Sequence, residues 1–202
     1  MFFHNAMATI DRHLAGAAGL TAAKKAQYRA AAEKVVRAMG PKALERWNAN
    51  VESINFYPDT ESLTRWADAK WPRDKQQQGR PRAGVCIVRT DRANRTKCLL
   101  HLDGGNDTGD IAASPSIAVY AHEFAHAIDC GPAKGMFLSD APDWIHAWNA
   151  EGTSICRSVG MEFLVGYREG FGVTAQLAWN NRRWFQRRYP RCWAFWSLAG
   201  LV

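Results

Sequence analysis

Apolar positions recur at helical spacing in the first quarter of the chain. Residues 21–40 are rich in alanine, and the pattern stops at Gly40-Pro41, a sequence that commonly ends a helix. A shorter helix is predicted directly afterwards, at residues 41–49. The N-terminal part, residues 1–50, is therefore expected to be helical.

The pattern then changes from helical spacing to short apolar runs. Residues 51–58 alternate between polar and apolar positions and predict a strand that ends at Pro58. Two further apolar runs, at 84–89 and 97–103, flank the polar sequence TDRANRT and predict a β-hairpin. These runs define a strand-rich part at residues 51–113. A helix and two loops are also predicted within it, at 61–71, 71–84 and 104–114.

The best-marked helix of the chain is predicted to begin at Ser114. Ser114 is a suitable N-cap, Pro115 suits the first helical position, and Gly131-Pro132 lies just past the expected end. The helix carries the sequence VYAHEFAHAIDC, residues 119–130, which contains two histidines and a glutamate.

Two more helices are predicted after this one. Residues 142–152 predict a short tryptophan-bearing helix that ends at Gly152, and residues 167–179 predict a longer one. The order of helices, then strands, then helices predicts an α+β fold. At 202 residues the chain is expected to form one domain, with its active-site helices in residues 114–202.

Composition narrows the class of protein. Apolar residues make up 47% of the chain and aromatic residues 11%, which is typical of a folded globular protein. The net charge of +7 favours acidic partners, nucleic acid included. Five widely spaced cysteines without a CxxC pair indicate reduced thiols. We find neither a Sec signal peptide nor an apolar run long enough for a membrane span, so we expect a soluble protein that is cytoplasmic or exported by another route.

The chemistry is concentrated in His122, Glu123 and His126. Two histidines four residues apart on a helix project from one face, so both imidazoles can bind one zinc ion. Glu123 lies about 100° further round the helix, where it can contact a water on the metal. Zinc would polarise that water and a substrate carbonyl, while the glutamate accepts the proton and passes it to the leaving amine. We predict Zn²⁺ as the cofactor and a protein or peptide as the substrate.

A catalytic zinc needs a third protein ligand and an open fourth position. The metzincin pattern is excluded, because Asp129 and Pro132 stand where that pattern requires glycine and histidine. Glu169, on the helix predicted 43 residues after His126, is the best candidate, since gluzincin-type sites take a glutamate from a second helix. The rival candidates are Glu162, Asp140, Asp143 and His146, the last of which fits a packed or surface residue better.

Three further positions have a functional and a structural interpretation. Asp129 can accept the free ring N–H of a liganding histidine, or it is a solvated acid near a helix end. Tyr167 can stabilise the oxyanion of a tetrahedral intermediate, or it packs in the core. The strand at 97–103 is either an edge strand that pairs with an extended peptide or a core strand, and its His101 is expected to be a packing or surface residue.

The sequences HEFAHAID, WIHAWNAEGTS, REGF and YPRCWAF, within residues 115–196, resemble the catalytic domain of anthrax lethal factor and its relatives, a gluzincin family of zinc metalloproteases. The resemblance implies a zincin-like fold with a small mixed or antiparallel sheet and a C-terminal helical part. It implies that His122, His126 and Glu169 bind zinc and that Glu123 is the general base. Val173 stands where the family carries a second acid, and Val159 where it carries a tyrosine.

Two other functions remain open on the sequence alone. A nucleic-acid-binding protein is suggested by arginines beside aromatic residues near the C-terminus. These arginines are Arg182, Arg183, Arg187, Arg188 and Arg191, and the aromatic residues are Trp184 and Tyr189. The second function is a non-catalytic interaction domain with a structural zinc. Such a zinc site would be closed by four protein ligands.

Overall fold

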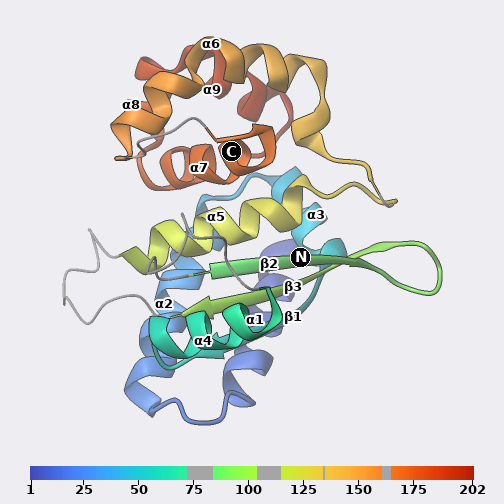
Figure 1. The fold of residues 1–202 in the computed structure, drawn as a ribbon, viewed down its shortest axis with the longest axis vertical. Helices are drawn as coiled ribbons and strands as arrows, with labels where there is room; N and C mark the ends of the chain where they lie inside the picture. The colour runs from blue at the N-terminus through green and yellow to red at the C-terminus, as the bar shows by residue number, and fades with distance from the viewer. Residues whose placement is uncertain (72–83, 104–114, 134, 161–164) are drawn as a thin grey trace.

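The computed structural model describes residues 1–71, 84–103, 115–133, 135–160 and 165–202 (Figure 1). Within these ranges the chain forms nine α-helices and three strands. In chain order the elements are α1 (Phe2–Ala15), α2 (Ala22–Ala38), α3 (Pro41–Asn50), β1 (Val51–Tyr57), α4 (Thr60–Lys70), β2 (Gly84–Thr90), β3 (Thr96–Asp103), α5 (Pro115–Asp129), the short 3-10 helix η1 (Leu138–Asp140), α6 (Pro142–Ser158), α7 (Tyr167–Asn180), α8 (Arg182–Arg188) and α9 (Pro190–Leu198).

Most of the predicted elements are confirmed, and the α+β class with them. The helices α2 and α3 meet at Gly40-Pro41, and α5 begins at Pro115, as their local signals indicate. The predicted loops at 71–84 and 104–114, together with the Ser114 cap, lie almost wholly outside the described residues. No helix in the described ranges combines the length and the apolar character that crossing a membrane requires.

The sheet is small and mixed, with the strand order β1-β3-β2. The predicted hairpin is confirmed, because β2 pairs antiparallel with β3, and β1 pairs parallel with β3 on the other side. The structure decides between the two interpretations of the strand at 97–103. This strand is β3, the central strand of the sheet, so the core interpretation is confirmed, and β1 and β2 form the two edges.

The helix α5 lies between the sheet and α7 (Figure 1). The side chains of Ala121, Phe124, Ala125 and Ile128 are fully buried, so the apolar side of the motif helix is its packing side, as its sequence indicates. Buried side chains from Ala6 in α1 to Leu201 belong to one hydrophobic cluster, of which α5 is a part. The motif helix is therefore held from both sides by the core.

The C-terminus of α5 is fixed by two side chains of α3. Arg46 Nε donates to the carbonyl of Ile128 at 2.6 Å, and its Nη2 donates to the carbonyls of Asp129 and Cys130 at 3.3 and 2.8 Å. Asn50 Nδ2 donates to the carbonyls of Ala127 and Cys130 at 2.8 and 2.9 Å. The last carbonyls of a helix have no partner within the helix, so these bonds supply what the helix itself lacks. They connect the N-terminal helices directly to the motif helix.

The helix α6 is longer than its sequence predicts. Gly152 does not end it but lies within it, since α6 continues to Ser158. A Cβ at Gly152 would come within 2.6 Å of the Trp148 indole, and a Cβ at Gly170 of α7 would do the same. The glycine therefore makes room for a buried tryptophan between α6 and α7, and this packing requirement outweighs the helix-ending tendency of glycine.

The α3 cap yields a stability prediction. The substitution Arg46→Gln removes most of the hydrogen bonds to the last turn of α5 and leaves buried carbonyls without donors. We expect the free energy of unfolding, measured by urea denaturation, to fall by about 3 kcal/mol. Arg65→Gln serves as the control, because Arg65 pairs with Glu61 on the exposed surface of α4 and should change stability by less than about 0.5 kcal/mol. Equal effects of the two substitutions would contradict the role given to Arg46.

Candidate metal centre

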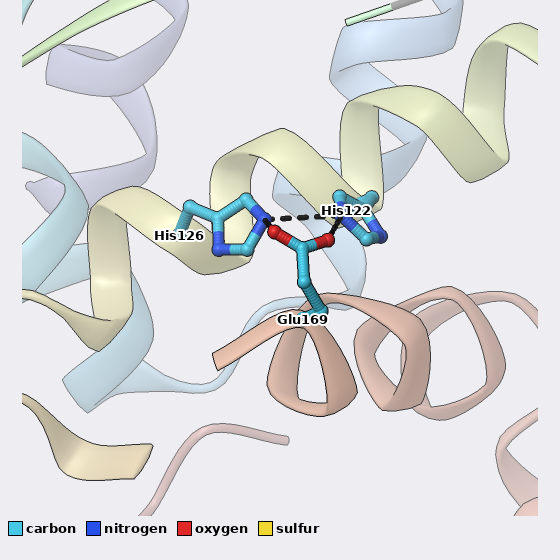
Figure 2. A group of neighbouring side chains, drawn as sticks. All are labelled: His122, His126 and Glu169. Carbon is cyan, nitrogen blue, oxygen red and sulfur yellow. Dashed lines mark hydrogen bonds and ion pairs between the residues drawn. The ribbon is translucent and has the colours of Figure 1, made fainter. Parts of the chain in front are cut away.

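His122, His126 and Glu169 come together between α5 and α7 (Figure 2). The Nε2 atoms of the two histidines are 3.0 Å apart. Glu169 Oε2 is 3.3 Å from His122 Nε2, and Glu169 Oε1 is 3.7 Å from His126 Nε2. The predicted third ligand, 43 residues along the chain, therefore reaches the two histidines of the motif.

These distances fit a metal ion held by three ligand atoms. Ligand atoms about 2.05 Å from a tetrahedrally coordinated zinc lie about 3.3 Å from one another. The three measured separations of 3.0, 3.3 and 3.7 Å scatter around that value. One ligand atom from each residue lies within 4.8 Å of the others, so the group could hold a metal ion.

The charges of the group favour a cation. Burial lowers the pKa of His122, but its hydrogen bond with Glu169 and the nearby charge of Glu123 offset this, and the pKa is raised. The pKa of Glu169 is lowered to about 2, chiefly by the same hydrogen bond. Burial and the charge of His122 lower the pKa of His126 to about 4. The carboxylate of Glu169 thus lies against the imidazoles of His122 and His126, and a metal ion bound there would compete with protons for the same ligand atoms.

Glu123 is buried beside this group and under the edge strand. Its side chain packs against Gly84, the first residue of β2, where a Cβ would come within 2.6 Å of Glu123 Oε1. Burial raises the pKa of this carboxyl to about 7, with the charge of His122 opposing the rise. A carboxyl group with such a pKa can accept and return a proton near neutral pH.

Two residues of α7 complete the surroundings of His122, and sequence reasoning did not identify either. A Cβ at Gly172 would lie 2.7 to 2.8 Å from the atoms of the His122 ring, so only glycine lets α7 come this close. Gln176 Nε2 lies 3.0 Å from His122 Nδ1. If Nε2 of His122 binds a metal, its Nδ1 carries the proton, and the Gln176 amide can turn so that its oxygen accepts it. Gly172 and Gln176 follow Glu169 by three and seven residues, so they lie on the same face of the helix. This spacing is the feature of the sequence from which they could have been predicted.

Asp129 has a different partner from the one predicted. Its Oδ1 accepts the backbone N–H of Ser139 at 2.7 Å, and its Oδ2 accepts the Ser139 hydroxyl at 2.7 Å. The carboxyl is 1% exposed, and burial raises its pKa to about 6 against these two hydrogen bonds. Asp129 is therefore a buried acid that ties the end of α5 to η1. It is not a solvated acid, and within the described ranges its two carboxyl oxygens accept from Ser139 and not from a histidine N–H.

Tyr167 also points elsewhere. Its hydroxyl donates to Asn149 Oδ1 of α6 at 3.2 Å, its carbonyl accepts Trp144 Nε1 at 3.0 Å, and its side chain is 38% exposed. The phenol of Tyr167 thus lies at the contact between α6 and α7, where its hydroxyl bonds to Asn149 and not to a residue of the metal group. It lies neither in the core nor among the residues of that group.

The rival ligands lie apart from the group or outside the described residues. Asp140 Oδ2 is paired with Arg168 at 3.3 Å. Asp143 and His146 line a separate pocket between α6 and α9. Glu162 falls in residues 161–164, which are not described. His101 is buried and stacks on Trp66 with ring centroids 3.8 Å apart, in agreement with a packing role.

The arginine-rich segment near the C-terminus forms α8 and the start of α9. The arginines of this segment are exposed, namely Arg182, Arg183, Arg187, Arg188 and Arg191. The guanidinium of Arg182 lies 5.1 Å from the ring centroid of Trp193. The surface is basic and partly aromatic, and nucleic-acid binding by it stays a prediction.

No protein-family model, curated protein or solved structure matches the chain. The chemistry of the site therefore rests on its own geometry.

The contact between Gly172 and His122 yields a prediction about metal affinity. In Gly172→Ala the added Cβ would displace the imidazole or push the two helices apart. We expect zinc affinity, measured by competition with a chromogenic chelator, to fall by about 10- to 100-fold. Gly166→Ala is the matched control, since a Cβ there meets no atom within 4 Å. An unchanged affinity in Gly172→Ala would show that the helix spacing does not set the ligand positions.

The raised pKa of Glu123 yields a prediction for the metal-free protein. The folded pKa of about 7 exceeds the ordinary value of 4.5, so between these values the folded chain binds more protons than the unfolded chain. The contribution of this group to stability is therefore highest below pH 4.5 and decreases as pH rises to 7, by on the order of 3 kcal/mol. Glu123→Gln removes the titrating group and should flatten the fall in urea midpoint between pH 5 and pH 8.

The control for this pH experiment is Glu45→Gln, which removes an exposed carboxylate paired with Lys42. It should leave the slope of stability with pH unchanged. If Glu123→Gln keeps the full slope of the metal-free parent, Glu123 is not the group that titrates in this range.

Proposed function

We propose that the chain is a zinc-dependent endopeptidase of the zincin type, in which His122, His126 and Glu169 hold the metal. The observation that carries the proposal is the meeting of these three side chains from two helices, beside a buried carboxyl of raised pKa. Two imidazoles and one carboxylate are a ligand set of catalytic zinc sites in hydrolases. When bound, the ion supplies a Lewis acid that polarises a carbonyl and lowers the pKa of a water molecule.

Glu123 is proposed as the general base and later the general acid. Its carboxyl lies close enough to His122 and Glu169 for their charges to affect its pKa. It can take a proton from the attacking water and deliver it to the departing amine nitrogen. Burial under Gly84 holds the carboxyl in one place, so the residue needs little reorganisation during the reaction.

Access to the site is proposed to be from the side of Glu169. The Glu169 side chain is 59% exposed, whereas the side chains of His122 and His126 are 15% and 16% exposed. The edge strand β2 begins at Gly84, directly beside Glu123. An extended peptide that pairs with this edge would bring a peptide bond to the metal and the base together.

The structural-zinc alternative differs from this proposal in coordination. A structural site is closed by four protein ligands, whereas the group found in the described residues has three. X-ray absorption of the zinc-loaded protein distinguishes the two. Three protein ligands and one light-atom ligand from solvent support catalysis, and four protein ligands support the interaction domain.

Zinc content and cleavage test the proposal together. The parent protein should hold one zinc per chain and cleave members of an unbiased peptide library, detected by mass spectrometry. His126→Ala and Glu169→Ala should lose stoichiometric zinc. Glu123→Gln should keep the zinc but lose cleavage by about 100- to 10,000-fold, because only the proton transfer is removed.

Glu45→Gln is again the matched control and should retain both zinc and cleavage. A zinc-loaded parent that cleaves no peptide, with Glu123→Gln indistinguishable from it, would overturn the proposed function.

A further inference from the structure

A pocket of about 340 Å³ lies against the first turn of α7, the helix that carries Glu169. Its walls come from the C-terminal half of β2, from the segment that follows α5 and from the first turn of α7, and they include Val88, Thr90, Met136, Phe137 and Arg168. Each of these elements also borders the site. The first residue of β2, Gly84, lies against the Glu123 side chain. The helix α5 carries His126, and Arg168 directly precedes Glu169 in α7.

The strand β2 thus runs from Glu123 at its first residue to the pocket at its C-terminal half. The hairpin end of β2 and the segment after α5 lie on the same side of the molecule (Figure 1), and an isolated bridge between Arg95 and Ala133 joins them. Val88 follows Gly84 by four residues, which corresponds to about 13 Å along a strand. A peptide paired with β2 would therefore place a side chain in this pocket roughly four residues from the bond at the metal.

Arg168 is held in a fixed position at the pocket wall. Its guanidinium carbon lies 3.6 Å from the ring centroid of Phe137, and its Nη2 is paired with Asp140 Oδ2 at 3.3 Å. The side chain is nevertheless 54% exposed, so the face of the guanidinium plane opposite Phe137 is available to a ligand. A planar cation with one face on an aromatic ring can stack a second ring on its other face.

The other walls combine polar side chains, namely Arg89, which is paired with Glu52, Thr90 and Thr96, with two exposed apolar ones. Val88 is 44% exposed and Met136 is 55% exposed, and they are two of the seven large apolar side chains that are exposed in the described ranges. Exposed apolar side chains that gather at one concave place commonly mark a binding surface. Methionine sulfur also makes favourable contacts with aromatic rings.

We propose, on the basis of the peptidase function proposed above, that this pocket binds an aromatic side chain of the substrate, stacked on Arg168 and packed against Met136 and Val88. An acidic side chain suits the pocket less well, because Asp140 already pairs with Arg168 and would repel it. A basic side chain would be repelled by Arg168. An aliphatic side chain would fill the space but gain no interaction with the guanidinium face.

The test measures binding without requiring cleavage. The zinc-loaded Glu123→Gln protein is immobilised and a randomised peptide library is passed over it. Bound peptides should be enriched in Phe, Tyr or Trp at one position, and a Tyr peptide should bind at least about tenfold more tightly than its Ala counterpart. Adding Arg168→Ala should abolish most of this difference. Adding Phe137→Leu, which removes the ring beneath the guanidinium and keeps an apolar side chain, should reduce it in the same direction.

Arg183→Ala is the matched control, because it removes one exposed arginine of α8. The Tyr-to-Ala difference should persist in it. Zinc content and urea midpoints measured on every variant separate a lost pocket from a lost fold. The inference is overturned if no peptide binds, if no aromatic residue is enriched, or if the enrichment survives both Arg168→Ala and Phe137→Leu.

Cleavage by the parent protein distinguishes the two proposals. If the parent cleaves peptides without preferring aromatic residues, the pocket assignment fails and the proposed peptidase function stands. If aromatic peptides bind through Arg168 but none is cleaved, the pocket assignment stands and the peptidase function fails.

Discussion

The close approach of α7 to α5 is the constraint on which the site depends. It occurs at Gly172, where the backbone of α7 lies against the imidazole of His122 and leaves no room for a Cβ. The same approach brings Glu169 to both histidines and Gln176 to the far nitrogen of His122. On the other side, the C-terminus of α5 is held by Arg46 and Asn50 of α3. The geometry of the three ligands is thus a consequence of how one buried helix is held, and not of the motif alone.

The site combines a buried half and an exposed half. Glu123 is 7% exposed and is covered by Gly84, the first residue of the edge strand β2, which fixes the position of its carboxyl. Glu169 faces solvent from the first turn of α7, next to Arg168 and its pocket. A proton-transferring carboxyl benefits from a buried and fixed position, whereas a substrate needs an open approach. The two carboxylates meet these opposite requirements because they come from different helices.

Sequence predicted the parts of the structure that local signals specify. Proline and glycine marked the junction of α2 and α3, and proline marked the start of α5. The four-residue spacing of His122 and His126 predicted that they share one face of the helix. The residues that were missed or misread depend on packing between distant segments. Gly152 looked like a helix end, yet it accommodates Trp148 inside α6. Asp129 and Tyr167 carry suitable chemistry at suitable spacing, but Ser139 and Asn149 are their partners. Likewise, the strand order that puts β3 in the centre is not encoded in the hydrophobic pattern of β3 itself.

The unequal exposure of His122, His126 and Glu169 has a consequence for how a metal ion would enter the group. Both histidines project from a helix packed on the sheet and on α7, so their nitrogens are in position before any ion arrives. Glu169 reaches them from the other helix, through a side chain that is 59% exposed. A metal ion held by this group would then meet the two imidazoles in positions already fixed by the core, and the carboxylate would close on it from the solvent side.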